Sequence, residues 1–118
     1  MIYVLVYPEF ESRLARRIGR FRSAHEPERA KLVPPHITLV FGLKHAVPKS
    51  MLALCESVSS NATELTIEFS HCEIAYDPFE KVQKLSLVCG NGKDALTEWH
   101  DLLYAGSHRS KSKSELPY

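Results

Sequence analysis

The stretch Pro34–Leu43, which reads PPHITLVFGL, decides the fold, and it raises a question about one residue. Its two prolines favour an extended backbone at the start of the segment. The residues after them are mainly β-branched, aliphatic or aromatic, which is typical of a strand, and we expect that strand over His36–Phe41. A polar, titratable histidine stands at the head of this otherwise apolar run.

Alternate residues of a regular strand face the same side of a sheet. The expected faces are therefore His36, Thr38 and Val40 on one side, and Ile37, Leu39 and Phe41 on the other. On this interpretation His36 and Thr38 point the same way, roughly 6–7 Å apart along the strand.

His36 and Thr38 are the candidate catalytic residues. Imidazole exchanges protons near neutral pH, and a threonine hydroxyl can donate a hydrogen bond to a phosphate oxygen. The bare pattern H-x-[ST] is weak evidence, because about one chance occurrence is expected and a second is present at His108-Arg109-Ser110. The alternative for His36 is a histidine at a strand edge whose ring is simply hydrogen-bonded.

Composition indicates one soluble globular domain. The chain has 118 residues, with 44% hydrophobic and 25% charged residues, and no apolar run long enough to cross a bilayer. The N-terminus MIYVLVYPEF has no basic n-region, so we interpret it as a strand rather than a signal peptide. We therefore expect a cytoplasmic protein.

Metal-binding and disulfide patterns are not found in the sequence. Three widely spaced cysteines, without a C-x-x-C pair, suit reduced and mostly buried thiols. No pair of histidines has the short spacing of zinc ligands. We expect surface or otherwise satisfied histidines at His25 and His45 in loops, His71 at a strand break and His100 on a helix.

Hydrophobic periodicity predicts the remaining elements. Strands are expected at Ile2–Tyr7, covered on both faces, at 65–76 with a break near Ser70-His71, and at Val82–Cys89. Apolar stripes predict helices from Phe10 to Phe21, from Pro48 to Val58, and from Ala95 to Leu103, closed by Gly106; His25–Lys31 is expected to be a loop. This order predicts an α+β fold with helices packed on a mostly antiparallel sheet.

The element order of the first third of the chain is repeated in the last third. In both, an apolar strand is followed by a helix and a polar loop. The first then reaches Leu32-Val33-Pro34-Pro35, and the last reaches Leu116-Pro117-Tyr118. We therefore expect a strand equivalent to His36–Phe41 to begin within a few residues of Tyr118.

PPHITLVFGL resembles the first signature of the two-histidine (2H) phosphoesterase superfamily, which includes 2′-5′ RNA ligase-like proteins and cyclic phosphodiesterases. The opening strand MIYVLVYP, the following helix and the elements through Leu103-Tyr104 match that family's order over nearly the whole chain. The resemblance implies two pseudo-symmetric lobes of mostly antiparallel sheet, with helices outside and a central groove. It also implies a single domain over residues 1–118, incomplete at its C-terminus and truncated before the second-motif strand.

By resemblance, one histidine is a general base, a second is the general acid, and the threonine or serine of each motif holds the phosphate without a metal. His36 and Thr38 correspond to the first motif, with Thr38 as phosphate-binding residue. Leu116-Pro117-Tyr118 resembles the lead-in to the second motif, but its histidine does not follow. His108 and Ser110 are the only substitute, in a stretch without apolar residues to form a strand.

The resulting hypothesis is a phosphodiesterase acting on 2′,3′-cyclic phosphate or 2′-5′ bonds of RNA or nucleotides. Its expected substrates are RNA ends or cyclic nucleotides. We expect no cofactor, no metal and no membrane association, and we expect the protein to be a monomer. The alternative is a non-catalytic RNA- or nucleotide-binding module, which an arginine-rich helix between Arg13 and Arg22 would suit. A third possibility is a structural domain without a ligand. Tyr3, Tyr7 and Phe41 are expected in the core, although an aromatic near the groove could stack on a base.

Overall fold

The structure is a computed structural model, and it describes residues 1–44, 47–78 and 80–104. Within these residues the elements are arranged in the order β1 (Ile2–Val6), α1 (Ser12–His25), α2 (Pro27–Leu32), β2 (Ile37–Leu43), α3 (Pro48–Asn61), β3 (Phe69–Asp77), β4 (Val82–Cys89) and α4 (Lys93–Leu103). β1 pairs with β2 and β3 with β4, both antiparallel. The predicted α+β class with antiparallel pairing is confirmed.

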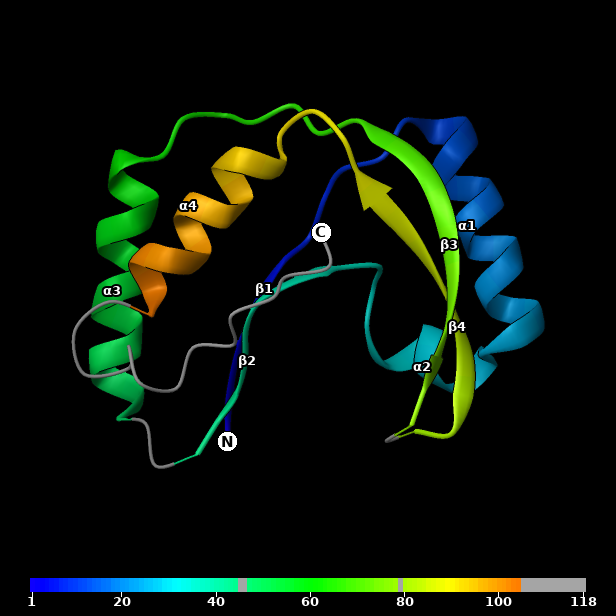
Figure 1. The fold of residues 1–118 in the computed structure, drawn as a ribbon, viewed down its shortest axis with the longest axis horizontal. Helices are drawn as coiled ribbons and strands as arrows, with labels where there is room; N and C mark the ends of the chain where they lie inside the picture. Colours follow the sequence, from blue (N-terminus) through cyan, green and yellow to red (C-terminus); the bar gives the residue numbers. More distant parts are fainter. Residues whose placement is uncertain (45–46, 79, 105–118) are drawn as a thin grey trace.

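The elements gather on two sides of the molecule (Figure 1). Helices α3 and α4 lie together beside the β1–β2 pair, and α4 packs directly on β2. Helices α1 and α2 lie beside the β3–β4 hairpin, where the rings of Phe10 and Phe69 stack with their centroids 5.9 Å apart. None of the described helices is long and apolar enough to cross a membrane.

The core lies between β2, α3 and α4. Its buried hydrophobic residues come mainly from these elements: Leu39, Val40, Leu43, Met51, Cys89, Leu96, Leu103 and Tyr104. In α4 the buried positions Leu96, His100 and Leu103 are four and three residues apart, which places them on one helical face. The same face carries the buried histidine into an otherwise apolar environment.

Strand β2 is irregular, and this changes which residues share a face. Leu5 pairs with Thr38, whereas the neighbouring Val4 pairs with Val40, so the register shifts by one residue at Leu39. Adjacent residues of β1 face opposite sides, and paired residues share a side. Thr38 and Val40 therefore lie on opposite faces of the pair, and the prediction that they share a face is wrong.

The buried face of the β1–β2 pair is set by this register. It carries Ile2, Val4 and Val6 from β1, opposite Leu43, Val40 and Ile37 from β2. The core positions of β2 therefore do not follow a regular alternation: Leu39 and Val40 are adjacent and both buried, and Leu43 follows three residues later, because the register shifts again between Ile2 and Val4. The strand starts at Ile37 and ends at Leu43, one residue later and two residues further than expected.

Two further predictions about elements are wrong. The expected loop His25–Lys31 contains α2, which begins at Pro27; proline at the first helical position is pre-organised for helix and has no amide to leave unpaired. Residues 65–68 are not strand, although the predicted break is confirmed as a register shift between Phe69 and His71. The strand Val82–Cys89 and the start of α3 at Pro48 are as predicted.

Two expectations about burial also need correction. The first strand is covered on one face only, since Tyr3 is 58% exposed and Tyr7, just after the strand, is 53% exposed. Of the three cysteines, Cys89 is buried and Cys55 is half-buried, but Cys72 is exposed on β3.

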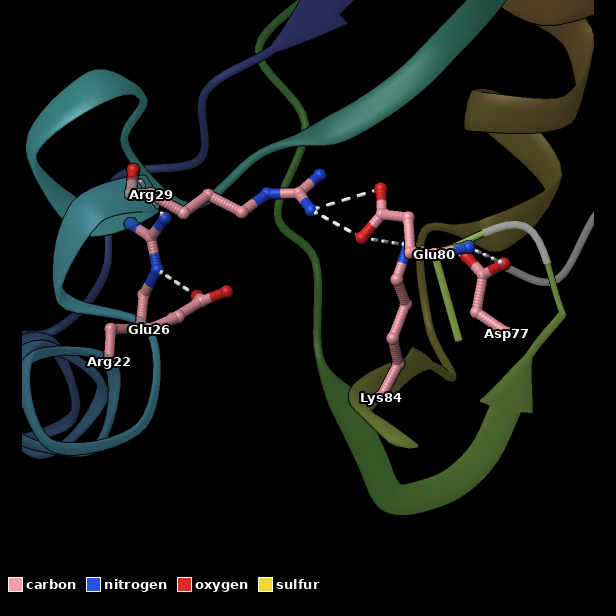
Figure 2. A network of polar contacts seen from close by, with 6 residues as sticks. All are labelled: Arg22, Glu26, Arg29, Asp77, Glu80 and Lys84. Carbon is pink, nitrogen blue, oxygen red and sulfur yellow. Dashed lines mark hydrogen bonds and ion pairs between the residues drawn. The ribbon is translucent and has the colours of Figure 1, made fainter. Parts of the chain in front are cut away.

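A chain of polar contacts links the helices to the hairpin (Figure 2). Arg29 of α2 reaches both carboxylate oxygens of Glu80, at 3.2 and 2.9 Å, and Lys84 of β4 lies 3.5 Å from the same carboxylate. Lys84 also pairs with Asp77 at 2.7 Å. These side chains are partly solvent-accessible, so the chain of contacts orients α2 against the hairpin more than it stabilises the fold.

Candidate active site

His36 lies immediately before β2, at the end of the extended segment that connects it to α2. Its Nδ1 is 2.9 Å from the carbonyl oxygen of Pro34. A carbonyl only accepts hydrogen bonds, so Nδ1 carries the proton and donates it. In the neutral ring the lone pair is then on Nε2, which makes Nε2 the basic atom of His36.

Thr38 lies in β2 opposite Leu5, on the face of the β1–β2 pair that does not join the core. The pairs Leu5–Thr38 and Val6–Ile37 are consecutive and show no shift, so β2 is regular at this point. Tyr7 continues the alternation of Leu5, and its ring meets the ring of His36 edge-on, with centroids 6.4 Å apart. We call the side carrying Leu5, Tyr7, His36 and Thr38 the site face.

Tyr3 belongs to the same face, and Gly42 makes room for it. Gly42 has φ +42°, and a Cβ there would lie 3.0 Å from the Tyr3 hydroxyl oxygen and 3.1 Å from its Cζ. A side chain at this position would therefore collide with the ring. The absence of one lets the tyrosine lie close to β2.

Tyr3 and Tyr7 are the residues of this face that sequence reasoning assigned to the core. The signal that identifies them is the alternation of aromatic and aliphatic residues in IYVLVY: Ile2, Val4 and Val6 pack against the core, and the residues between them do not. A segment in which every residue is apolar conceals that alternation, because both faces look equally fit for burial.

The back of β2 is fastened to α4 near the site. Phe41 donates its backbone N–H to the hydroxyl oxygen of Tyr104 at 3.0 Å, and Tyr104 is 2% exposed. The ring of His100 lies against that tyrosine, with centroids 4.5 Å apart. Since regular elements hold functional groups more accurately than loops do, this attachment helps fix the strand that carries Thr38.

The remaining histidines are arranged in several ways. His25 ends α1 and is exposed, and His71 is exposed between the Ser70 hydroxyl and the Glu73 carboxylate, at 2.8 and 2.9 Å. These two fit the expected surface histidines, although His25 is helical. His100 is buried; its Nδ1 contacts Asp101, whereas Nε2 has no hydrogen-bond partner in the described part of the chain.

Several predicted features lie outside the described residues. They are His45, Gly106, the alternative second motif His108 and Ser110, and the segment Leu116-Pro117-Tyr118. Among the residues that the structure describes, no three His, Cys, Asp or Glu side chains are grouped so that they could hold a metal ion.

The geometry defines an α+β protein with a histidine and a threonine presented at the start of one strand. A model of the family described as the 2′-5′ RNA ligase superfamily matches residues 10–118. The chain therefore belongs to this superfamily, which is the 2H phosphoesterase superfamily. Searches of curated proteins and of solved structures gave no match.

Proposed function

We propose that this protein is a metal-independent phosphodiesterase that acts on 2′,3′-cyclic phosphate or 2′-5′ phosphodiester bonds of RNA or nucleotides. Membership of the superfamily supports the phosphoesterase class. The observation that carries the proposal is the hydrogen bond from His36 Nδ1 to Pro34, because it leaves Nε2 as a base at the start of the strand that carries Thr38.

In the proposed reaction, His36 Nε2 removes a proton from water as the water oxygen attacks phosphorus. A P–O bond to water forms, and the P–O bond to one ribose oxygen breaks. Thr38 donates a hydrogen bond to a non-bridging phosphate oxygen. A second histidine protonates the leaving oxygen, and the candidate that the sequence offers for it is His108.

Tyr7 is the proposed neighbour of the substrate base. Its ring is exposed and borders His36, so a nucleobase adjoining a phosphate at His36 would have an aromatic surface within reach. The finer architecture remains part of the proposal. It comprises two pseudo-symmetric lobes in one domain with a groove between them, in a cytoplasmic monomer.

The test is hydrolysis of a 2′,3′-cyclic mononucleotide in EDTA by wild type, His36→Ala and Thr38→Ala. Loss of an acid–base group costs about 10²–10⁴-fold in rate, and loss of one donor to the developing charge costs about 10²-fold. His71→Ala is the matched control, because that histidine is exposed on β3 and plays no part in the proposed chemistry. Full activity in His36→Ala refutes the proposal.

A non-catalytic RNA- or nucleotide-binding module is the second candidate. The arginines of α1 favour this candidate, because their positive charge could bind phosphates without any catalysis by His36. Binding of a cyclic nucleotide or RNA without turnover, in a protein that carries every residue of the family motifs, would support this candidate over the enzyme.

A further inference from the structure

Helix α1 carries a row of arginines on one face. Arg13, Arg16, Arg17 and Arg20 are exposed and separated by three- and four-residue steps. Such steps place side chains next to one another along a helix, and the row extends for about 10 Å of the axis. We call these four residues the arginine stripe.

The arginine stripe forms no ion pair with the residues that the structure describes. Within residues 1–44, 47–78 and 80–104, the arginines that form ion pairs are Arg22, with Glu26, and Arg29, with Glu80. Five of the 15 basic residues of the chain lie in α1, and none of the 14 acidic residues does. A chain with a net charge of +1 thus concentrates positive charge on this one helix.

This arrangement works against the stability of α1 itself. Like charges three and four residues apart repel each other. Arg13 and Arg16 also lie near the N-terminus of the helix, where its dipole favours negative groups. The stripe therefore does not contribute to the fold, and an external anion would relieve the repulsion.

The edge of the stripe offers an aromatic surface. Phe21 is 45% exposed, and its ring lies against that of His25, with centroids 4.4 Å apart. The other large apolar residues of α1, Leu14 and Ile18, are half-buried. The helix therefore lacks the broad exposed apolar face with which amphipathic helices enter a membrane.

The stripe faces away from the segment that precedes His36. A cavity of about 240 Å³ lies between α1, α2 and Pro35, and Ala15, Gly19 and Arg22 line it from α1. At 100° per residue these positions are about half a turn from the stripe. A mononucleotide at His36 would therefore not touch the arginines.

We propose that the arginine stripe, with Phe21 and His25, binds a single-stranded RNA tract away from the reacting nucleotide. Guanidinium groups bind phosphates in a bidentate manner, and all basic residues of α1 before His25 are arginines. Unstacked bases pack on exposed aromatic rings, which favours a single strand over a duplex. The choice of RNA as the bound anion rests on the proposed function. The inference adds that the substrate is an RNA polymer rather than a free nucleotide.

The experiment measures binding of labelled single-stranded oligouridine by fluorescence anisotropy at several salt concentrations. The variant Arg16→Gln/Arg20→Gln is expected to raise Kd about tenfold and to flatten the salt slope by about 1.4, at about 0.7 per lost phosphate contact. The matched control is Lys49→Gln/Lys81→Gln, which removes equal charge from exposed positions on α3 and in the hairpin turn. Its Kd should stay within about twofold.

Phe21→Ala provides an independent signature. Loss of base stacking is expected to raise Kd between about 5- and 150-fold while leaving the salt slope unchanged. Phe21→Leu keeps the apolar bulk but removes the ring, so it should weaken RNA binding similarly. It replaces Phe21→Ala as the test if the Ala variant does not fold. Wild-type affinity in both the Phe21→Leu and the double-arginine variants overturns the inference.

Two further results would overturn RNA binding by the arginine stripe. An equal loss in the lysine control would show that net charge alone drives binding, and this overturns the inference. So would stripe-dependent binding to phosphatidylserine vesicles without binding to oligouridine. Because the assay needs no turnover, it separates the two proposals: active His36→Ala refutes the catalytic role, whereas unchanged RNA binding by the stripe variants refutes the surface.

Discussion

Replacement of Gly42 by alanine tests the irregular geometry of β2 directly. The backbone at this position has φ +42°, and an added Cβ would lie 2.8 Å from Met1 Sδ and 3.0 Å from the Tyr3 hydroxyl oxygen. The left-handed conformation costs a residue with a Cβ about 1–2 kcal/mol. Met1 and Tyr3 are both exposed and can move aside at little cost, so we expect the free energy of unfolding to fall by about 1–2 kcal/mol.

Gly19→Ala is the matched control, with the same chemical change and the opposite expected sign. Gly19 lies inside α1, and a Cβ built there meets no heavy atom within 4 Å. Alanine is favoured over glycine in a helix interior by about 0.8–1 kcal/mol. We therefore expect Gly19→Ala to raise the free energy of unfolding by up to about 1 kcal/mol.

Urea denaturation followed by circular dichroism measures both changes, provided that the slope with denaturant stays constant. A loss of about 1–2 kcal/mol is a measurable part of the roughly 5–15 kcal/mol that stabilises a typical domain. Wild-type stability in Gly42→Ala would refute the register of β2 and the close approach of Tyr3. A shift of both variants in the same direction would show that backbone freedom of the unfolded chain dominates instead.

Three further predictions test burial and the polar contacts. Iodoacetamide should modify Cys72 first, because burial raises the pKa of the thiols of Cys55 and Cys89 and so lowers their reactive thiolate fraction. Peptide mapping by mass spectrometry measures the order of modification, and earliest reaction of Cys89 would contradict this prediction. Leu96→Ala should lower the free energy of unfolding, measured by urea denaturation, by about 2–5 kcal/mol, because this side chain of α4 is fully buried. A loss below about 1 kcal/mol would mean that α4 is not packed as described. A double-mutant cycle on Arg29 and Glu80 should give a coupling free energy below about 1 kcal/mol, because both side chains are nearly half exposed; a value above about 2 kcal/mol would indicate a pair shielded from water.

Much of the element order can be predicted from the sequence, because turn residues and helical stripes are local signals. Val82–Cys89 is bounded by polar and glycine residues, and the sequence predicts its limits to the residue. The helix α2 escapes prediction because the short, mostly polar segment that begins at Pro27 carries no hydrophobic stripe. Its evidence is the capping preference of proline, which competes with the interpretation of a polar segment as a loop.

The faces of β2 cannot be predicted in the same way, because period-two reasoning assumes a regular ladder. Thr38 and Val40 are two residues apart, but the shift at Leu39 places them on opposite sides. A bulge is fixed by the pairing of two strands that are distant in sequence, and the single segment PPHITLVFGL contains no signal for it. Only the part before the bulge, with Ile37 and Thr38 in regular register, obeys the simple alternation.

The position of the bulge has a consequence for the site. Because the shift comes after Thr38, the strand presents this hydroxyl on the site face while Val40 joins the core beside α4. A regular ladder would turn either both side chains towards the core or both away from it. The bulge thus allows two nearby residues of one strand to do different things: Val40 anchors the strand, and Thr38 remains on the side where Tyr7 meets the ring of His36.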